Sequence, residues 1–549
     1  MEISKEKLDY YFKKAKEAKE ASKSTYNDVA SYCYNSFTIK DEARDKDEIR
    51  SVETVISTSI NTFVNTIMTG VFSRGSNWAT TKVNDILFQN ANSTEIDTAV
   101  ESRKKEINES LEKGTQTTFE YINQTNFYTE IAKMVKDWAV LGTGAYKIRA
   151  TGDINKPFTY LYMSLDGLYF LENQDSKIEI VFRERYKFKK RDITESYGDK
   201  AKIPTDLTED EAEMTIIECC VPSEKVKGQY EFLVLTTDYE TVIHEEVLSY
   251  NPFVISRMLT EGVNIWGIGL GVIGLDLFKE LKRLKTLREE QAQNIVKPPY
   301  IARGDTQLIE AFRMQSGRVN FGGRTVPSTG AEADNENFMT VENVRVSESL
   351  IPVENDIANI KNDIRELFIS NPISDVAEYK NRSATETQAR MQIFRIRWSG
   401  PYENLQIELL EPTLMVPFRI LTDQKIITFS ESETEGEKFN LDFTTIQYIN
   451  ELSKMQGLEK VQNLINYATM ADQLKQLASG VALKPLEVIN ELKEVYRIPL
   501  KISMSDQEFK QAEDEKQALI QQAQIAAQQP PEGGTGLETG INGENTEVL

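Results

Sequence analysis

The stretch from Asn381 to Leu421 constrains the fold of this chain most strongly, because it predicts one long helical element. Ser383 precedes Glu386 with the spacing of a capping box, in which the hydroxyl and the carboxylate each satisfy a free backbone amide at a helix start. Apolar side chains then recur at roughly helical spacing as far as Leu414. A helix of roughly forty residues is unusual, since helices in globular proteins average about a dozen. Its length indicates a subunit that spans a large assembly.

Glycine and proline interrupt this helical pattern near its middle. Gly400 and Pro401 stand together there, and a proline both lacks an amide donor and clashes with the preceding helical turn. We therefore expect a helix kink at Gly400 and Pro401, with further interruptions at Pro412 and Pro417.

The charge balance is strongly acidic and argues against a protein that grips DNA through its phosphates. Lys and Arg number 64 and Asp and Glu number 86, which gives a formal net charge of −22. A protein that binds the phosphate backbone tightly is expected to present a basic face, although a local basic patch is compatible with this balance. The start of the chain does not resemble a secretory signal, and no apolar run is long enough to span a bilayer. We expect a soluble protein.

Cysteine and histidine are scarce, which limits the kinds of chemistry that this chain can perform. It contains Cys33, Cys219, Cys220 and a single histidine, His244. We therefore expect neither a four-ligand zinc site nor a histidine relay away from His244, whereas metal chemistry based on carboxylates alone stays open. Without a disulfide framework, the cysteines fit a reducing compartment. His244 lies in a strand-like segment, where we expect a structural residue.

The order of predicted elements indicates an α+β chain that is mainly helical. Residues 1–70 and 92–141 have helical periodicity, and Gly142 and Gly144 end the second stretch and turn it into a strand. Residues 145–255 contain alternating and β-branched runs, which predict a mostly antiparallel sheet with a short helix inserted into it.

Two further helices are predicted to flank a turn-rich segment. Residues 266–297 and 347–369 each carry an apolar stripe at helical spacing, whereas 298–346 are rich in glycine and strand-like. The pattern predicts a stalk of two helices with a small β-rich tip. The tip is locally basic through Arg303, Arg313, Arg318 and Arg324.

The C-terminal part of the chain alternates between short strands and helices. Residues 425–430 and 439–446 predict a short strand pair, and residues 447–496 predict helices. Ser505–Gln529 predicts a final helix rich in Gln and Ala, and the tail after it has the composition of a disordered segment.

The segment Gly269–Gly274, GLGVIG, matches the glycine pattern of a dinucleotide-binding turn that opens a helix. Glu289 and Glu290 lie near the distance at which a ribose-binding acid would follow. That site also requires a strand that runs directly into the first glycine and a parallel unit after it, and the sequence predicts neither. The glycines therefore favour a close approach of neighbouring backbones, with a nucleotide-binding enzyme as the alternative. Gly317–Thr325 lacks the Gly-Lys-Ser/Thr ending of a phosphate-binding loop.

Charged residues of the first stalk helix alternate in sign, which is typical of a helix surface with ion pairs. In an oligomer we expect such residues to join neighbouring subunits rather than to contact DNA. The residues are Lys279, Glu280, Lys282, Arg283, Lys285, Arg288, Glu289 and Glu290. Lys380 and Arg382, in the polar loop before the long helix, are better candidates for contact with a polyanion. We expect no catalytic residue, no metal site and no cofactor, because the acidic clusters lie in polar segments typical of solvated surface.

Five segments in order along the chain carry a resemblance to a known family. They are WAVLGTGAYKI (Trp138–Ile148), WGIGLGVIGLDLFKELKRLKTLREE, NRSATETQARM (Asn381–Met391), ELLEPTLMVPF and SMSDQEFKQAEDEKQ. Together they resemble the portal, or head-to-tail connector, proteins of short-tailed tailed bacteriophages. At Arg382–Glu386 the order Arg-Ser-Ala-Thr-Glu is a slight permutation of the family's Arg-x-Thr-Ala-x-Glu-like helix start.

The resemblance implies a mainly helical portal fold with a wing that contains a β-sheet region, a two-helix stem, a small β-rich clip, a long kinked helix and a helical crown. The implied regions are 1–265 (wing), 266–297 and 347–369 (stem helices), 298–346 (clip), 370–382 (tunnel loop), 383–446 (kinked wing helix and following strands), 447–504 (crown), 505–529 (C-terminal barrel helix) and 530–549 (disordered tail).

The resemblance also implies a structural role without enzymatic activity, in the virion after assembly in the host cytoplasm. The protein would form a homo-oligomeric ring, typically dodecameric, at one capsid vertex. Double-stranded DNA would pass through it without sequence specificity, during packaging by a separate terminase and during ejection. The clip would dock terminase and then the tail adaptor, and capsid and scaffolding proteins would be further partners, with no membrane contact. Lys380 and Arg382 become DNA-channel candidates and Arg303, Arg313, Arg318 and Arg324 docking candidates. The second alternative is a helical scaffold or adaptor protein.

Overall fold

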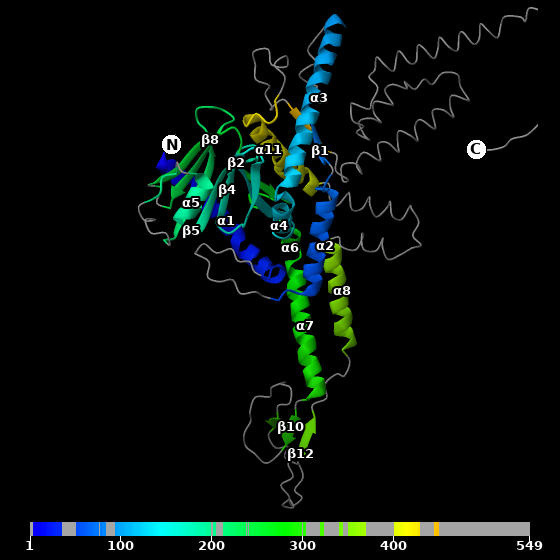
Figure 1. Ribbon diagram of the computed structural model, residues 1–549. Helices are drawn as coiled ribbons and strands as arrows, with labels where there is room; N and C mark the ends of the chain where they lie inside the picture. Colours follow the sequence, from blue (N-terminus) through cyan, green and yellow to red (C-terminus); the bar gives the residue numbers. More distant parts are fainter. Residues whose placement is uncertain are drawn as a thin grey trace, which may run out of the picture. The chain divides into compact units, whose positions relative to one another are not determined.

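The computed structural model describes residues 4–35, 51–75, 77–83, 94–198, 201–204, 212–237, 239, 241–298, 300–303, 319–322, 340–343, 350–368, 400–428 and 444–448. Backbone contacts divide the chain into Met1–Leu452 and Ser453–Leu549, and every described residue belongs to the first unit. Helices and β-sheets both contribute to this unit (Figure 1), so the predicted α+β class is confirmed. The helices expected beyond Tyr448 and the C-terminal tail lie outside the described residues.

Long helices dominate the first part of the chain, as the sequence predicted. They are α1 (Lys5–Cys33), α2 (Thr54–Gly70), α3 (Thr94–Gln124) and α4 (Phe127–Val140). Ser4 caps α1 by accepting a hydrogen bond from the backbone N–H of Lys7. In α2, Ile56, Ile60 and Phe63 share the buried stripe that its periodicity predicted. Among the described helices, none is long and apolar enough to cross a bilayer.

The β-rich region folds into two antiparallel sheets. Its strands are β2 (Thr143–Asp153), β3 (Lys156–Met163), β4 (Leu168–Glu172), β5 (Ile178–Phe188), β6 (Met214–Pro222), β7 (Tyr230–Thr236), β8 (Val242–Leu248) and β9 (Phe253–Arg257). A three-stranded sheet has the order β3-β2-β9, and a five-stranded sheet has the order β4-β5-β6-β7-β8. The predicted short insert is α5 (Lys190–Tyr197), which ends at Gly198 with φ of +78°.

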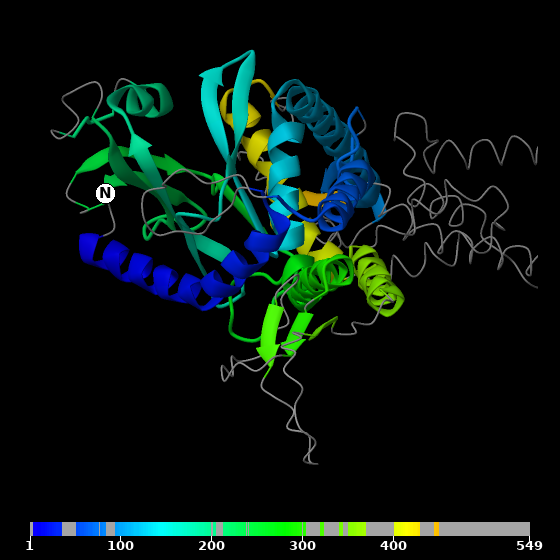
Figure 2. The same cartoon turned by 90° about the horizontal axis from the view of Figure 1, so that it is seen from below.

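Both faces of the five-stranded sheet are buried, which explains why β6 is apolar at nearly every position. Leu8 and Ala15 of α1 pack against one face, which contains Cys219. Cys220 lies on the other face, within the main core. Figure 2 shows α1 running across one side of this sheet. Burial raises the pKa of both thiols, so the adjacent cysteines serve as small apolar core residues.

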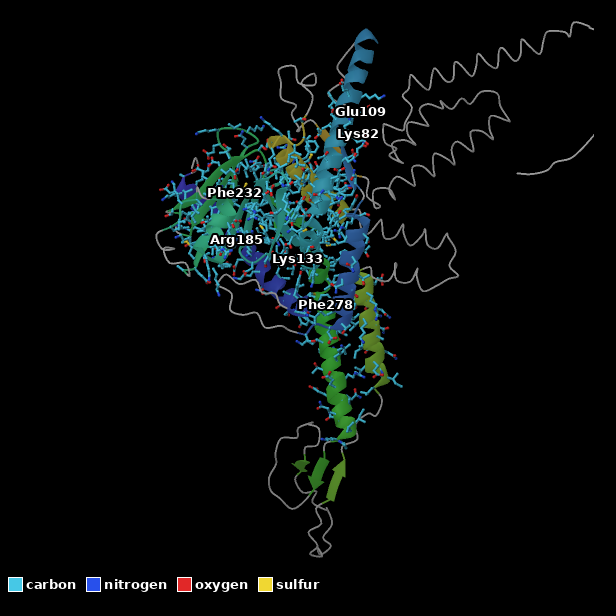
Figure 3. The ribbon with its side chains drawn as sticks, in the orientation of Figure 1. Lys82, Glu109, Lys133, Arg185, Phe232 and Phe278 are labelled. Atoms are coloured by element: carbon cyan, nitrogen blue, oxygen red, sulfur yellow. The ribbon has the colours of Figure 1, made fainter. Side chains whose placement is uncertain are left out.

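The helices predicted for the stalk are present at the expected positions. A short helix, α6 (Leu270–Ile273), leads into α7 (Leu275–Val296), and α8 (Ile351–Leu367) packs beside α7 (Figure 1). Phe278 lies near the start of α7 (Figure 3) and stacks on Phe368 just after α8, with ring centroids 6.4 Å apart. Between these helices, β10 (Tyr300–Arg303), β11 (Val319–Gly322) and β12 (Thr340–Asn343) form a sheet in the order β11-β10-β12.

The described part of the predicted long helix is helical from Gly400 to Asp423. Its middle turn, Gln406–Leu410, is π-helical, and α11 (Glu411–Asp423) follows. Pro412 occupies the first turn of α11, directly after the π-helical turn that interrupts the regular α-helix, whereas Pro417 lies inside α11, so the interruption expected at Pro417 is wrong. Burial of the apolar face of α11 offsets the one hydrogen bond that Pro417 removes. Residues 381–399 lie outside the described part, so the Ser383 cap and the Gly400–Pro401 kink stay predictions.

The strand that follows α11 has a different partner from the one expected. Residues 425–428 form a turn and a bend rather than a strand, and Lys425 has φ of +59°. Instead, β13 (Thr444–Tyr448) pairs antiparallel with β1 (Ala79–Val83), from the beginning of the chain. Residue alternation predicts a strand but carries no information about its partner, which explains the error.

Candidate functional site

The structure brings together two of the segments that carried the family resemblance. The turn that follows α4, around Gly142, lies directly against the glycine-rich segment that opens the stalk, Gly267–Gly274. Met258 donates its backbone N–H to the carbonyl of Gly142 at 2.8 Å, which also ties the end of β9 to this turn. We call this contact between Gly142 and Gly267–Gly271 the glycine junction. It connects α7 to the sheets.

The two backbones of the glycine junction can touch because glycine has no side chain. Gly142 has φ of +96°, and a Cβ there would lie 2.3 Å from the backbone N of Gly269. A Cβ at Gly267 would lie 1.9 Å from the carbonyl oxygen of Gly142, and one at Gly271 would lie 2.6 Å from that of Val140. The sequence-based expectation of a close backbone approach is confirmed, and Gly142 is the partner that it did not name.

This geometry argues against the dinucleotide alternative. No strand runs into Gly269, because β9 ends at Arg257 and an irregular segment follows. The helix that opens there, α6, ends at Ile273 after a single turn. The carbonyl of Val140 and the backbone of Gly142 occupy the space beside these glycines that a pyrophosphate would need. Among the described residues, no cluster of His, Cys, Asp and Glu could hold a metal ion.

Aromatic and hydroxyl side chains hold the glycine junction together. Gly267 donates its N–H to the hydroxyl of Thr143 at 2.9 Å, and Tyr26 of α1 donates its hydroxyl to the carbonyl of Gly267. Trp266 is fully buried, and its ring centroid lies 4.5 Å from that of Phe170 on β4. Helix α1, strands β2 and β4 and the stalk therefore meet at this point.

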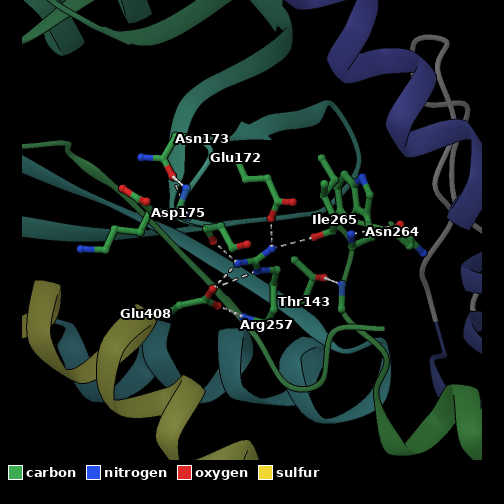
Figure 4. Close-up of polar contacts among 12 residues, drawn as sticks. Thr143, Glu172, Asn173, Asp175, Arg257, Asn264, Ile265 and Glu408 are labelled. Atoms are coloured by element: carbon green, nitrogen blue, oxygen red, sulfur yellow. Dashed lines mark hydrogen bonds and ion pairs between the residues drawn. The ribbon is translucent and has the colours of Figure 1, made fainter. Parts of the chain in front are cut away.

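Arg257, the last residue of β9, forms a second connection next to the glycine junction (Figure 4). Its guanidinium donates to Glu172 at 2.7 Å and to the carbonyl of Ser176 at 2.8 Å, both at the β4–β5 turn. It also donates to the carbonyl of Ile265, just before the stalk, at 3.3 Å. The arginine side chain is only 5% exposed, so these contacts lie in a region of low dielectric, where they are strong.

The same arginine holds the π-helical turn of the long helix. A single carboxylate oxygen of Glu408, Oε1, accepts both from Nε of Arg257 at 2.9 Å and from its Nη2 at 2.5 Å. The other carboxylate oxygen of Glu408 accepts from the backbone N–H of Arg257 at 2.6 Å. Burial lowers the pKa of Arg257, but the two carboxylates outweigh it and raise the pKa. No spacing pattern in the sequence could indicate a pair so far apart in the chain.

A buried carboxylate, Asp137, lies one turn before the glycine junction on α4. It accepts hydrogen bonds from the hydroxyls of Tyr34 at 2.8 Å and Tyr162 at 2.5 Å, and its backbone carbonyl accepts from Gly142 at 3.2 Å. Burial raises the pKa of Asp137 to about 6, although both tyrosines and Lys136 oppose this shift.

Asp137→Asn is expected to change how the stability of the protein depends on pH. The pKa of Asp137 is higher in the folded state than in the unfolded state. Its contribution to the free energy of unfolding is therefore complete below pH ~4 and is lost as the pH rises through ~6. Relative to Asp137→Asn, the wild type should therefore lose about 2–3 kcal/mol of unfolding free energy between these limits. Chemical unfolding of both proteins across this range checks it, and parallel profiles would contradict it.

The alternating charges of α7 form ion pairs within the chain. Lys279 pairs with Asp28 of α1 at 3.0 Å, and Arg288 pairs with Glu354 of α8 at 3.1 Å. Lys285 pairs with Glu53 before α2, and Arg283 with Glu280. The expected ion-paired surface is confirmed, with partners inside the subunit.

Of the other candidates, Arg303 ends β10, whereas Arg313, Arg318, Arg324, Lys380 and Arg382 lie outside the described residues.

Comparison with known proteins identifies the family. The family model for the bacteriophage head to tail connecting protein matches residues 5–502. The chain belongs to this family. The resemblance that five sequence segments indicated is thus confirmed, and the connector is a structural protein of the phage virion with a portal role.

A comparison with curated proteins found no match. A solved chain from the virion of a native gene transfer agent (GTA) particle is 8% identical with a TM-score of 0.30, covering 68% of the connector and 83% of that chain. That similarity is too low to bear on the fold.

Proposed function

We propose that the connector assembles into a closed homo-oligomeric ring, typically a dodecamer, at one vertex of the capsid. The ring would form the channel through which double-stranded DNA is packaged and ejected. It would contact capsid and scaffolding proteins, and would dock terminase first and the tail adaptor later. The match of the family model to residues 5–502 is the observation that carries this proposal.

The regions of the proposed ring subunit follow the order of the elements. Residues 1–265 would form the wing, α7 and α8 within 266–297 and 347–369 the stem, and the small sheet within 298–346 the clip. Residues 370–382 would form a tunnel loop, 383–446 the kinked wing helix with its strands, 447–504 the crown, 505–529 the barrel helix and 530–549 the tail. The glycine junction fixes the start of the stem to the wing, and Arg257 joins the wing to Glu408 in the segment assigned to the kinked wing helix.

The charge distribution fits a channel that lets DNA slide. Tight binding to the phosphate backbone needs several unneutralised cations, whereas four cations of α7 are paired with carboxylates of the same chain. A net charge of −22 on each copy adds repulsion between the ring and the duplex. We assign DNA contact to Lys380 and Arg382 and partner docking to Arg303, Arg313, Arg318 and Arg324, without catalysis. Normal genome packaging after replacement of both Lys380 and Arg382 by alanine would remove the first assignment.

The mass of the purified connector in solution tests the proposal. One chain has a mass of 62.6 kDa, so a closed ring should sediment as one discrete species many times heavier than this. A scaffold or adaptor that bundles with partners through its helices would sediment as a monomer or small oligomer. A monomer that persists at high protein concentration would contradict the ring.

A further inference from the structure

Three cations share one buried carboxylate between the two large sheets. Glu218 of β6 has a side chain only 1% exposed, and it lies 3.2 Å from Nζ of Lys147 on β2. Arg185 and Arg183 of β5 place their Nη1 atoms 3.4 Å and 3.6 Å from the same carboxylate. Tyr197 of α5 donates its hydroxyl to it as well. Burial alone would raise the pKa of Glu218, but the three cations lower it to about 2, so this group is ionised.

The positive charge of this cluster exceeds its negative charge. Burial lowers the pKa of Lys147 to about 8, so at pH 7 it remains mostly protonated. Its Nζ lies 4.2 Å from the ring centroid of Phe232 (Figure 3), and Arg185 lies over the ring of Phe188 at the same distance. Nη1 of Arg183 is buried and has no hydrogen-bond partner among the described residues. Glu218 alone cannot balance two arginines and a lysine, and buried charge without a counter-charge is costly.

An open cavity of about 300 Å³ lies along β5 at the two arginines. Its lining residues are Ser164, Asp166, Arg183, Glu184, Arg185, Tyr186, Lys187 and Phe188. Two carboxylates are among them, Asp166 and Glu184, and Glu184 accepts hydrogen bonds from the hydroxyls of Tyr169 and Tyr186. The pairing of β5 with β6 shifts register between Arg185 and Phe188, and Lys187 has φ of +55°. Such irregularities redirect side chains and are common beside binding sites.

We propose that this cavity binds a small oxyanion of the phosphate class through Arg183 and Arg185. By formal charge, Lys147, Arg183, Arg185 and Lys187 exceed Glu218, Asp166 and Glu184 by one, and the anion would supply the remaining counter-charge. The planar fork of an arginine suits two parallel hydrogen bonds to such an oxyanion. The hydroxyl of Ser164 offers a further donor, and Lys187 adds a third positive charge to the lining. This site is independent of the proposed ring and of the DNA channel.

Calorimetric titration of the full-length connector with inorganic phosphate, at constant ionic strength set by chloride, tests the site. The wild type should show a saturable heat with about one phosphate per chain. Arg185→Gln should weaken this binding tenfold or more, because a charge-assisted bidentate contact is lost. Lys189→Gln is the matched control, since Lys189 follows the same strand, is 44% exposed and pairs with Glu213. Its affinity should equal that of the wild type.

Two outcomes would overturn the site. One is the absence of a saturable heat for the wild type at millimolar phosphate, and the other is an equal affinity in Arg185→Gln and Lys189→Gln. If Arg185→Gln fails to fold, Arg185→Lys tests the same contact. This variant keeps the positive charge but removes the planar guanidinium that can make two parallel hydrogen bonds. It should bind phosphate more weakly than the wild type, and an unchanged affinity would contradict the arginine contact.

Discussion

Gly142→Ala is expected to destabilise the connector more than almost any other single substitution. Alanine at φ of +96° is strained, and its Cβ would lie 2.3 Å from the backbone of Gly269 and of Ile268. Both obstacles are backbone atoms, so only a displacement of the stalk away from α4 relieves the overlap. We expect a loss of unfolding free energy above about 4 kcal/mol, which is exceptional for one substitution. Thermal and denaturant unfolding measure it.

Gly152 provides the matched control for this experiment. It also has a positive φ, of +75°, but a Cβ there would meet nothing within 4 Å. Gly152→Ala should therefore cost only the backbone strain, about 1–2 kcal/mol. Similar losses for Gly142→Ala and Gly152→Ala would show that the glycine junction does not depend on close backbone contact.

Arg257→Ala is expected to produce the second large loss. It leaves Glu408 and Glu172 without their shared cation and leaves the carbonyls of Ser176 and Ile265 without this donor. Removing one partner of a buried ion pair costs about 3–5 kcal/mol. Hydrogen exchange should also speed up locally in the π-helical turn, because Glu408 loses both guanidinium contacts and only the backbone N–H of residue 257 still ties Gln406–Leu410 to β9.

A double-mutant cycle with Glu408→Gln isolates the interaction energy between Arg257 and Glu408 from the other effects of each substitution on stability. The coupling energy between Arg257 and Glu408 should reach about 2 kcal/mol, because the two side chains are in direct contact. Arg288→Ala is the control, since its pair with Glu354 is about half exposed and such surface pairs contribute about 1 kcal/mol or less. A negligible coupling energy, or equal losses for Arg257→Ala and Arg288→Ala, would contradict the role of Arg257.

Local sequence patterns predicted the elements of the connector well and their partners poorly. Helical periodicity located α7 and α8, and alternation located the strands from β2 to β8, because these patterns depend on residues a few positions apart. The pairing of β13 with β1 depends on segments at opposite ends of the described chain. The same limit explains why Pro417 was expected to interrupt a helix that tertiary packing preserves.

The candidate site could be predicted from the sequence only where the type of a residue itself indicated its structural role. The glycines of Gly269–Gly274 indicated close backbone approach, because glycine is the residue that permits it. Gly142 stood out as a turn, but nothing in the sequence placed it against those glycines. Arg257 and Glu408 carry no signal at all, since a charged residue in an apolar segment is buried only when a distant partner satisfies it.

Electron microscopy of the purified connector shows directly whether the chain forms a ring. We expect closed rings in end-on views, each with a central opening, formed by many copies of one 62.6 kDa chain. A field that contains only small monomeric particles, even at high protein concentration, would contradict it.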